Sequence, residues 1–300
     1  MTARTCDTAI IGGGAVGLSC AYALASAGVG VMVLERDHVG AGASAGTACM
    51  VSSSHADRTA SPASLREGLR FLLDPKAPLK LRPRPSELSW IARFTAASLD
   101  GDGAHAGTAL LQRLALRSTE LHRGWSDALG TGLKLHGTLN IWDGPDAEAE
   151  RAALVEETRH AGLAIDELDA TAVAALEPSV RPGMIGALAP GDGHVDSLAF
   201  TQRVGDGARA AGAEILEGVE VIRVEREGAR IRLLTTAGAV VADRLVVAAG
   251  VWSRRFADDL GLPLPISPAK GYHVEFAGAA PEAQRPIYLS ASRCVATPLE

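Results

Sequence analysis

Cysteine is scarce in this 300-residue sequence, which holds only Cys6, Cys20, Cys49 and Cys294. No two of them form a C-x-x-C pair, the spacing used by structural zinc sites and thiol redox centres. Four scattered thiols also exclude a disulfide-stabilised scaffold. The pattern predicts no metal site, and it favours a reducing compartment and therefore a cytoplasmic location.

Positive charge is also in short supply. The sequence has 29 Lys and Arg residues against 35 Asp and Glu residues, a formal net charge of −6. Proteins that bind nucleic acids need a positive excess to neutralise phosphates, and so do basic membrane-surface proteins. The charge balance therefore argues against a nucleic-acid partner. An apolar fraction of 47% is enough to build real hydrophobic cores, and the length predicts about two domains.

Long apolar runs are limited to one segment, residues 8–34, which carries no charged side chain. Its length would allow a transmembrane helix or a signal peptide. However, Asp7 stands directly before it, and two small clusters of glycine divide it into pieces with different periods. A short β-branched run, a stretch with helical spacing and a second apolar run follow one another. The segment therefore predicts a strand, a turn, a helix and a second strand.

Glycine is abundant, at 33 residues, and three glycines form a G-x-G-x-x-G motif after the first predicted strand. Gly12 permits the tight turn, Gly14 lets the backbone approach a pyrophosphate, and Gly17 lets the helix pack closely on the sheet. Glu35 ends the second strand, where its carboxylate would bind ribose hydroxyls and repel a 2′-phosphate. The motif predicts a site for FAD or NAD rather than NADP, although Arg36 blurs this preference.

Residues 218–250 alternate as a β-meander and close in the buried run "RLVVAAG". Small residues at Ala248, Ala249 and Gly250 would leave room for a ligand at the carboxyl end of that strand. A helix is expected to start near Ser253.

The region between the two nucleotide-binding segments predicts a mixture of helices and strands. Its apolar stripe has helical spacing, and we assign it to packing: Leu110, Leu114, Leu121, Trp125 and Leu129. A strand is expected within 133–142, a helix over 145–162 and a short strand within 183–190. After Leu264 the chain is expected to return to strands, at 270–276 and 285–298.

Four segments carry a family resemblance: "DTAIIGGGAVGLSCAYALASAGVGVMVLERDHVGAGAS", "LLDPKAPLKLRPRP", "GDGHVDSLAFTQRVGDGARAAGAEI" and "VVAAGVWSRRFADDLGLPLPISPAKGYHV". They resemble the FAD-dependent amine oxidoreductases of the D-amino-acid oxidase and glycine oxidase superfamily. The D-amino-acid dehydrogenase branch is the most similar. The resemblance covers nearly the whole chain.

The resemblance implies an α/β fold. A Rossmann-like FAD-binding domain, made of a βαβ unit and the β-meander, would comprise residues 1–85 and 193–264. It would be interleaved with an α+β substrate domain on a mostly antiparallel sheet, residues 86–192 and 265–300. The family's C-terminal part, which supplies an arginine for the substrate carboxylate, has no match here, so the resemblance predicts that the chain is a fragment or a truncated product.

The resemblance also implies FAD contacts in addition to the glycine motif, Glu35 and Arg36. Pyrophosphate contacts would come from Ala15, Val16, Ala43 and Ser44. Ala48, Cys49 and Met50 would lie beside the flavin ring, and the backbone of Val221 would hold the adenine. The cofactor would be flanked from the second sheet by Ala249, Gly250 and Trp252. The family usually has glycine where Cys49 stands, so a side chain there would crowd the flavin or alter its potential.

The implied reaction is oxidation of the CH–NH bond of a small amine or amino acid: a D-amino acid, glycine or an N-methyl amino acid. Hydride would pass to flavin N5, and the resulting imine would hydrolyse to keto acid and ammonia. Candidate pocket residues are His55, Lys270, Tyr272 and His273, of which the first three are our predicted catalytic set.

Two other interpretations remain open at this stage. One is an NAD-dependent dehydrogenase, which the meander disfavours, and the other is a truncated, non-catalytic flavoprotein remnant. The sequence leaves the electron acceptor open between oxygen, a quinone and another carrier. It predicts no transmembrane segment, and it leaves open a peripheral contact with the inner face of the membrane or with a second copy of the chain.

Overall fold

The computed structural model of the chain describes residues 3–56, 59–73, 77, 80, 84–276 and 283–299. The chain divides into two compact units. Unit 1 comprises Met1–Thr47, Trp125–Gly132 and Asp196–His273, and unit 2 comprises Ala48–Gly124, Leu133–Val195 and Val274–Glu300. These two units are defined by contacts within the chain. The predicted FAD-binding and substrate domains are defined by function, with boundaries at 85, 192 and 264, and they stay a prediction. Each unit is described by itself below.

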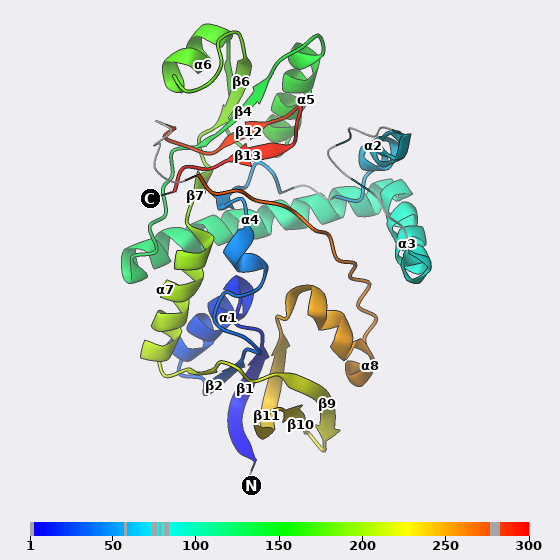
Figure 1. Ribbon diagram of the computed structural model, residues 1–300, viewed down its shortest axis with the longest axis vertical. Helices are drawn as coiled ribbons and strands as arrows, with labels where there is room; N and C mark the ends of the chain where they lie inside the picture. Colours follow the sequence, from blue (N-terminus) through cyan, green and yellow to red (C-terminus); the bar gives the residue numbers. More distant parts are fainter. Residues whose placement is uncertain are drawn as a thin grey trace. The chain divides into compact units, whose positions relative to one another are not determined.

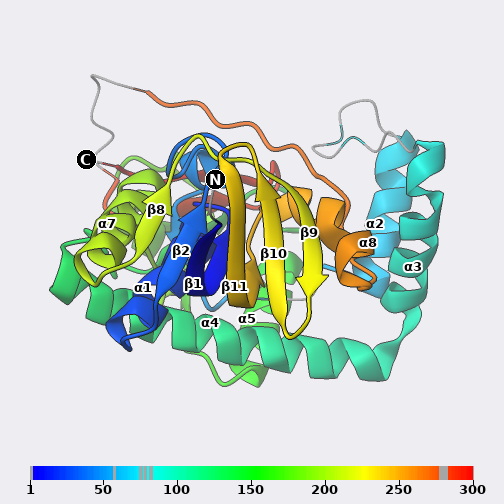
Figure 2. The ribbon, with the colours of Figure 1, turned by 90° about the horizontal axis from the view of Figure 1, so that it is seen from below.

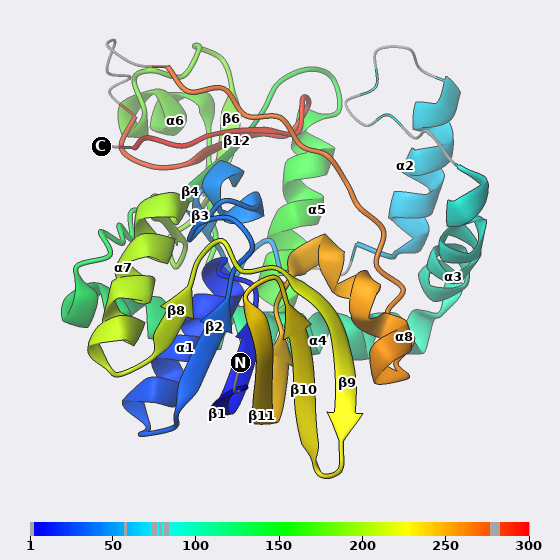
Figure 3. The same ribbon diagram turned by 60° about the horizontal axis from the view of Figure 1, so that its bottom comes forward.

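Unit 1 is built on a six-stranded sheet in the order β8-β2-β1-β11-β10-β9, which Figure 2 shows as one row of strands. Strands β8, β2, β1 and β11 are parallel, and β10 and β9 continue antiparallel from β11. The bounds of the six strands are β1 Arg4–Ile11, β2 Val31–Leu34, β8 Glu214–Leu216, β9 Val221–Glu227, β10 Arg230–Thr235 and β11 Gly238–Val247. The predicted strand–helix–strand unit and the β-meander are thus confirmed (Figure 3).

Two helices of unit 1, α1 (Ala15–Ser26) and α7 (Ser197–Ala210), pack against each other. Both have small residues along their contact, which allows the close approach. On the sheet, strand side chains such as Leu34 and Leu233 are almost fully buried and form one apolar cluster with Phe256. Unit 1 also contains the short helices η1 (Ala43–Gly46), η3 (Gly250–Phe256) and α8 (Ala257–Leu260). The helix expected near Ser253 therefore begins at Gly250, as a tighter 3₁₀ helix.

Unit 2 is built on a five-stranded sheet in the order β13-β12-β4-β6-β5 (Figure 1). Only β12 and β4 pair in parallel, so the expected mostly antiparallel sheet is present. A separate two-stranded ladder joins β3 to β7. The bounds of these strands are β3 Met50–Val51, β4 Thr138–Trp142, β5 Asp166–Leu168, β6 Ile185–Ala189, β7 Gly193–His194, β12 Ile287–Leu289 and β13 Cys294–Ala296.

The helices of unit 2 include α5 over the predicted 145–162 segment. Their bounds are α2 Pro62–Leu73, η2 Pro85–Glu87, α3 Leu88–Leu99, α4 Gly101–Leu129, α5 Ala147–His160 and α6 Ala170–Leu176, with the last residues of α4 belonging to unit 1. Within the described residues, no helix is both long enough and apolar enough to cross a membrane. The "LLDPKAPLKLRPRP" segment lies largely outside the described residues.

Two expectations for packing and local structure were wrong. The apolar stripe of α4 lies on one helix face, but Leu110 and Leu114 are more than half exposed, and only Trp125 and Leu129 at its end are half-buried. Helical spacing determines which residues share a face, not what lies against that face. Residues 270–276 form no strand, because no ladder pairs this segment within the described part of the chain.

Candidate functional site

In the turn between β1 and α1, the packing of the fold requires glycine at two of the three motif positions. Gly12 has a φ of +112°, and a Cβ there would lie 2.5 Å from the Ala248 carbonyl oxygen. A Cβ on Gly17 would lie 1.9 Å from the carbonyl oxygen of Gly12. Both approaches are closer than real Cβ contacts allow, so the packing of β1, α1 and β11 requires glycine at these two positions.

Gly14 is different, because the protein fold does not require it. Its φ of −84° and ψ of 179° are ordinary extended values, and a Cβ would meet only the Ser44 side-chain oxygen, at 3.2 Å. Gly14 is also the N-cap of α1, with no side-chain cap and no acidic residue in the first helical turn. The first amides of a helix have no intrahelical partner and attract anions. The cradle therefore fits a ligand phosphate, and a Cβ at Gly14 would project into it.

Glu35 is held beside this turn by backbone amides. Its Oε2 atom accepts a hydrogen bond from the Gly13 amide at 2.6 Å, and Oε1 accepts one from the Asp37 amide at 2.9 Å. A Cβ on Gly13 would lie 2.9 Å from that of Glu35, so glycine at position 13 permits the close approach of Glu35, a requirement that our motif analysis missed. The run of three glycines was the available signal. The two amides therefore fix the Glu35 carboxylate beside the glycine turn.

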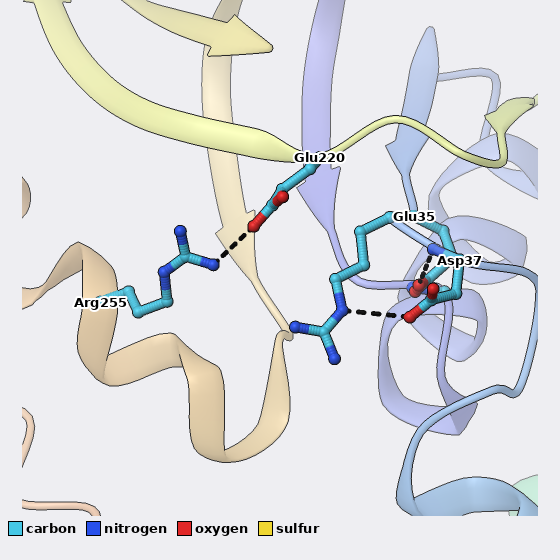
Figure 4. Close-up of polar contacts among 6 residues, drawn as sticks. Glu35, Asp37, Glu220 and Arg255 are labelled. Atoms are coloured by element: carbon cyan, nitrogen blue, oxygen red, sulfur yellow. Dashed lines mark hydrogen bonds and ion pairs between the residues drawn. The ribbon is translucent and has the colours of Figure 1, made fainter. Parts of the chain in front are cut away.

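Charged and aromatic side chains surround Glu35 on the surface of unit 1. The guanidinium carbon of Arg36 lies 4.2 Å from the Trp252 ring centroid, and Arg36 donates to Asp37 at 3.1 Å. Figure 4 shows the pair that Arg255 forms with Glu220, at 2.6 Å. These pairs are exposed, so they contribute little to stability.

The remaining predicted nucleotide contacts of unit 1 lie near the same sheet edge. β1 stands between β2 and β11, and the Ala248 amide donates to Ile11 while the Gly12 amide donates to Leu34. The carboxyl ends of the three strands therefore meet at the glycine turn, where the strand order reverses and open α/β sheets bind ligands. Ala249 follows directly.

A chain segment leading to β9 passes beside Glu35. The Val219 amide donates to the Glu35 carbonyl at 2.8 Å, two residues before the buried Val221. On the other side, Ser44 accepts from the Ala15 amide at 3.0 Å through its hydroxyl and from Ser197 at 2.7 Å through its carbonyl.

Unit 2 holds the predicted flavin-ring contacts. Ala48 accepts a 2.6 Å hydrogen bond from Thr297, and Met50 pairs with His194 between β3 and β7. Cys49 is buried and has a φ of +57°, in the left-handed region that favours glycine. Glycine, the residue that the resemblance implies at this position, would therefore also be favoured by the backbone, in addition to avoiding the crowding that we expected.

The strain at Cys49 predicts a difference between two variants that both lack the thiol. Cys49→Gly is expected to be more stable than Cys49→Ala by about 1 kcal/mol, because only glycine adopts this φ without a steric cost. Urea unfolding of the two variants measures the difference. Equal midpoints, or a more stable alanine variant, would show that the backbone at Cys49 is unstrained.

The three predicted catalytic residues are divided between the units. In unit 1, Lys270 and Tyr272 are exposed, Tyr272 at 86%, and the lysine Nζ lies 5.1 Å from the tyrosine ring centroid. His273 lies against Gly46, since a Cβ there would be 2.9 Å from its ring. In unit 2, His55 hydrogen-bonds to Ser54 and Asn140. Only His55 belongs to a buried polar cluster.

Other titratable groups do not form a second centre. Burial, followed by the charge of Asp7, raises the pKa of the Cys6 thiol to about 11, so this cysteine stays protonated and unreactive at neutral pH. Burial lowers the pKa of His122. Across the described ranges, no three His, Cys, Asp or Glu side chains are grouped so that they could hold a metal ion.

A glycine turn at a strand-order reversal, followed by an acid at the end of the next strand, defines a dinucleotide-binding α/β protein. The sequence family described as FAD dependent oxidoreductase matches residues 7–297, and the chain belongs to this DAO family. FAD is therefore the cofactor of its class, which disfavours the NAD-dependent interpretation.

Curated relatives are similar over most of the chain. A D-amino acid dehydrogenase of Agrobacterium fabrum is 31% identical over 280 residues, 89% of this chain and 66% of the relative. One from Cereibacter sphaeroides is 32% identical over 276 residues, 88% of this chain and 63% of the relative. The chain thus spans a little under two thirds of the length of these relatives.

Solved structures show the same fold. Glycine oxidase from Geobacillus kaustophilus superposes with a TM-score of 0.66 at 22% identity, over 87% of this chain and 60% of that protein. L-proline dehydrogenase from P.horikoshii gives a TM-score of 0.61 at 19% identity, over 87% of this chain and 57% of that protein.

Proposed function

We propose that the protein binds FAD at the glycine turn of unit 1 and oxidises the CH–NH bond of a small amino acid. The observation that carries the proposal is Gly14, a glycine that the fold does not require and that leaves the N-terminus of α1 open to a phosphate. Bound FAD would supply the acceptor for two electrons from the substrate, and the imine product would hydrolyse to keto acid and ammonia.

The residues of this chain would bind and orient the cofactor. Ala15 and Val16, in the first turn of α1, would lie over the pyrophosphate, with Ala43 and Ser44 beside them. Glu35 would accept hydrogen bonds from the ribose hydroxyls. Trp252, with Arg36 against its ring, would flank the nucleotide together with Val221, Ala249 and Gly250. Ala48, Cys49 and Met50 would contact the flavin ring.

The substrate is a proposal drawn from the relatives. Similar proteins are named D-amino acid dehydrogenase, glycine oxidase and L-proline dehydrogenase, so D-amino acids, glycine and N-alkylated amino acids are the first candidates. The acceptor that reoxidises the flavin would be oxygen, a quinone or another carrier. The cytoplasmic location and any membrane or self-association contact stay predictions.

A visible spectrum of the purified protein tests the cofactor. Oxidised flavin bands that survive gel filtration support the proposal. Stabilisation by NAD without such bands would instead support the NAD-dependent alternative. If neither flavin bands nor stabilisation by NAD is observed, the non-catalytic remnant is supported. With flavin bound, turnover of the candidate amino acids with an artificial electron acceptor, with and without oxygen, identifies the substrate class and separates an oxidase from a dehydrogenase.

Gly14→Ala is expected to weaken FAD binding at least about tenfold while the fold remains intact, because the new methyl group enters the phosphate cradle. Titration of the apoprotein with FAD, followed by flavin fluorescence, measures the affinity, and circular dichroism checks the fold. Gly101→Ala is the matched control, because a Cβ at Gly101 meets no other atom within 4 Å. Unchanged affinity in Gly14→Ala would place the pyrophosphate elsewhere.

A further inference from the structure

Unit 2 contains a buried carboxylate whose partners are all neutral. Asp192 is 1% exposed. Its Oδ2 atom accepts from the hydroxyls of Ser52 at 2.6 Å and Ser54 at 2.5 Å. Its Oδ1 atom accepts from the Ser53 amide at 2.9 Å and, at 3.3 Å, from the Ser53 hydroxyl and the Ser54 amide. Within the described residues, no lysine or arginine forms an ion pair with Asp192.

His55 lies at the open end of this cluster and is exposed. Its Nδ1 atom is 3.0 Å from the Ser54 hydroxyl oxygen and 3.3 Å from that of Ser52. Its Nε2 atom is 3.1 Å from Oδ1 of Asn140. The Tyr288 ring lies 5.2 Å from the imidazole ring and limits its rotation. The side chains therefore form a continuous chain from the carboxylate to the imidazole.

The hydrogens of this chain can be counted. Each serine hydroxyl has a single hydrogen, and both hydrogens point to Asp192, so the serine oxygens face Nδ1 with lone pairs. Two facing lone pairs repel, so Nδ1 must carry a hydrogen. In the neutral ring, Nε2 is then the nitrogen that carries the lone pair.

Asn140 is suited to both charge states of Nε2. It is 1% exposed, and its Nδ2 atom has no hydrogen-bond partner in the described part of the chain. The side-chain amide can present its carbonyl to a protonated Nε2 or its NH₂ group to a bare one. In either orientation one buried amide atom lacks a partner, which costs free energy in a purely structural cluster. A ligand atom at this place would satisfy it.

We propose that His55 accepts a proton at Nε2 from the ammonium group of the amino acid substrate, and that Asp192 and Ser54 are positioning residues that keep Nδ1 protonated. This inference rests on the proposed function. One N–H bond of the ammonium group breaks, its electron pair stays on the amine nitrogen, and a new N–H bond forms at Nε2. No electrons are transferred in this step. Because Nε2 has a single lone pair and Asn140 lies against it, the ammonium group would first replace the Asn140 amide as the partner of Nε2. The resulting imidazolium donates to Ser54, and to Asn140 once the amine has left, and the Asp192 carboxylate, one hydroxyl away, balances its charge.

The ring of His55 gives a test that does not depend on turnover. We expect ¹⁵N NMR of histidine-labelled protein to show His55 as the Nδ1–H tautomer when neutral, with the signal assigned by its loss in His55→Gln. Ser54→Ala and Asp192→Asn are expected to shift the ring towards the Nε2–H tautomer, whereas Ser53→Ala, whose hydroxyl does not contact His55, leaves it unchanged. An Nε2–H tautomer in the unaltered protein overturns the inference.

Kinetics test the proton transfer. His55→Gln is expected to lower kcat/KM for the amino acid on the order of 100-fold at neutral pH. The loss should shrink as the pH rises and the substrate amine becomes neutral by itself, which a structural defect would not produce. The titratable groups facing His55 are Asp192 and Tyr288, so Tyr288→Phe is included to assign the pH profile.

The outcomes separate this inference from the proposed function. If the protein oxidises amino acids and His55→Gln retains full activity at neutral pH, the inference is wrong and the proposed function stands. If the protein bound to FAD oxidises no candidate amino acid, the proposed function fails and the proton-transfer role fails with it. The tautomer result would then report only the Asp192–Ser54–His55 contacts.

Discussion

Replacing Gly17 with alanine is expected to destabilise the protein by about 4 kcal/mol or more, a loss far outside the range of ordinary single substitutions. The added methyl group would lie 1.9 Å from the Gly12 carbonyl oxygen, which is backbone and has no rotamer to move into. Relief of the clash requires α1 to shift away from β1. Because a typical domain is stable by only about 5–15 kcal/mol, the loss would consume a large part of the stability of the protein.

The control for Gly17→Ala is the same substitution where the structure has room. Gly124 lies inside helix α4, and a Cβ there meets nothing within 4 Å. Alanine has a higher helix propensity than glycine, so Gly124→Ala is expected to stabilise the protein by up to about 1 kcal/mol. Urea unfolding of both variants measures the contrast. Equal midpoints for Gly17→Ala and the unaltered protein would contradict the close approach of α1 to the turn.

The nucleotide-binding part of unit 1 was predictable from the sequence because its determinants are local. The strand, the glycine turn and the helix follow one another within residues 4–26, and the turn imposes φ and spacing limits that few residue types satisfy. Glu35 is only 22 residues from Gly13, its partner in the structure. Even so, the motif did not reveal which glycines serve the fold and which serve the ligand. That distinction required the positions of Ala248 and Ser44.

The cluster around His55 was not predictable in the same way. Asp192 is 138 residues from Ser54, and Asn140 is 85 residues from His55, so no local pattern links them. The three consecutive serines gave no signal by themselves, because a serine run most often indicates a loop.

The prediction that the α4 leucines are packed against other elements was wrong for a related reason. Periodicity along one helix carries no information about a second element far away in the sequence.

Removing Arg285 is expected to cost about 3–5 kcal/mol, because it would leave a buried charge without its partner. The Glu177 side chain is fully buried, and its Oε1 atom accepts from Arg285 Nε at 2.7 Å. Its other hydrogen-bond partner among the described residues is the Gln284 amide, at 3.2 Å. Among the described residues, the carboxylate in Arg285→Ala would keep only that neutral donor. Arg285 also donates to the His136 carbonyl at 2.7 Å, so the segment before β12 would lose a second anchor.

An exposed ion pair provides the comparison for Arg285→Ala. Arg117 and Glu120 are 2.7 Å apart on α4, both more than half exposed, and Arg117→Ala is expected to cost at most about 1 kcal/mol. Adding Glu177→Gln to Arg285→Ala should recover part of the loss, because the buried charge is then absent. Denaturant unfolding of the four proteins, including the unaltered one, measures these differences. If Arg285→Ala costs no more than Arg117→Ala, solvent must reach Glu177, and the charge that Arg285 balances is not a buried one.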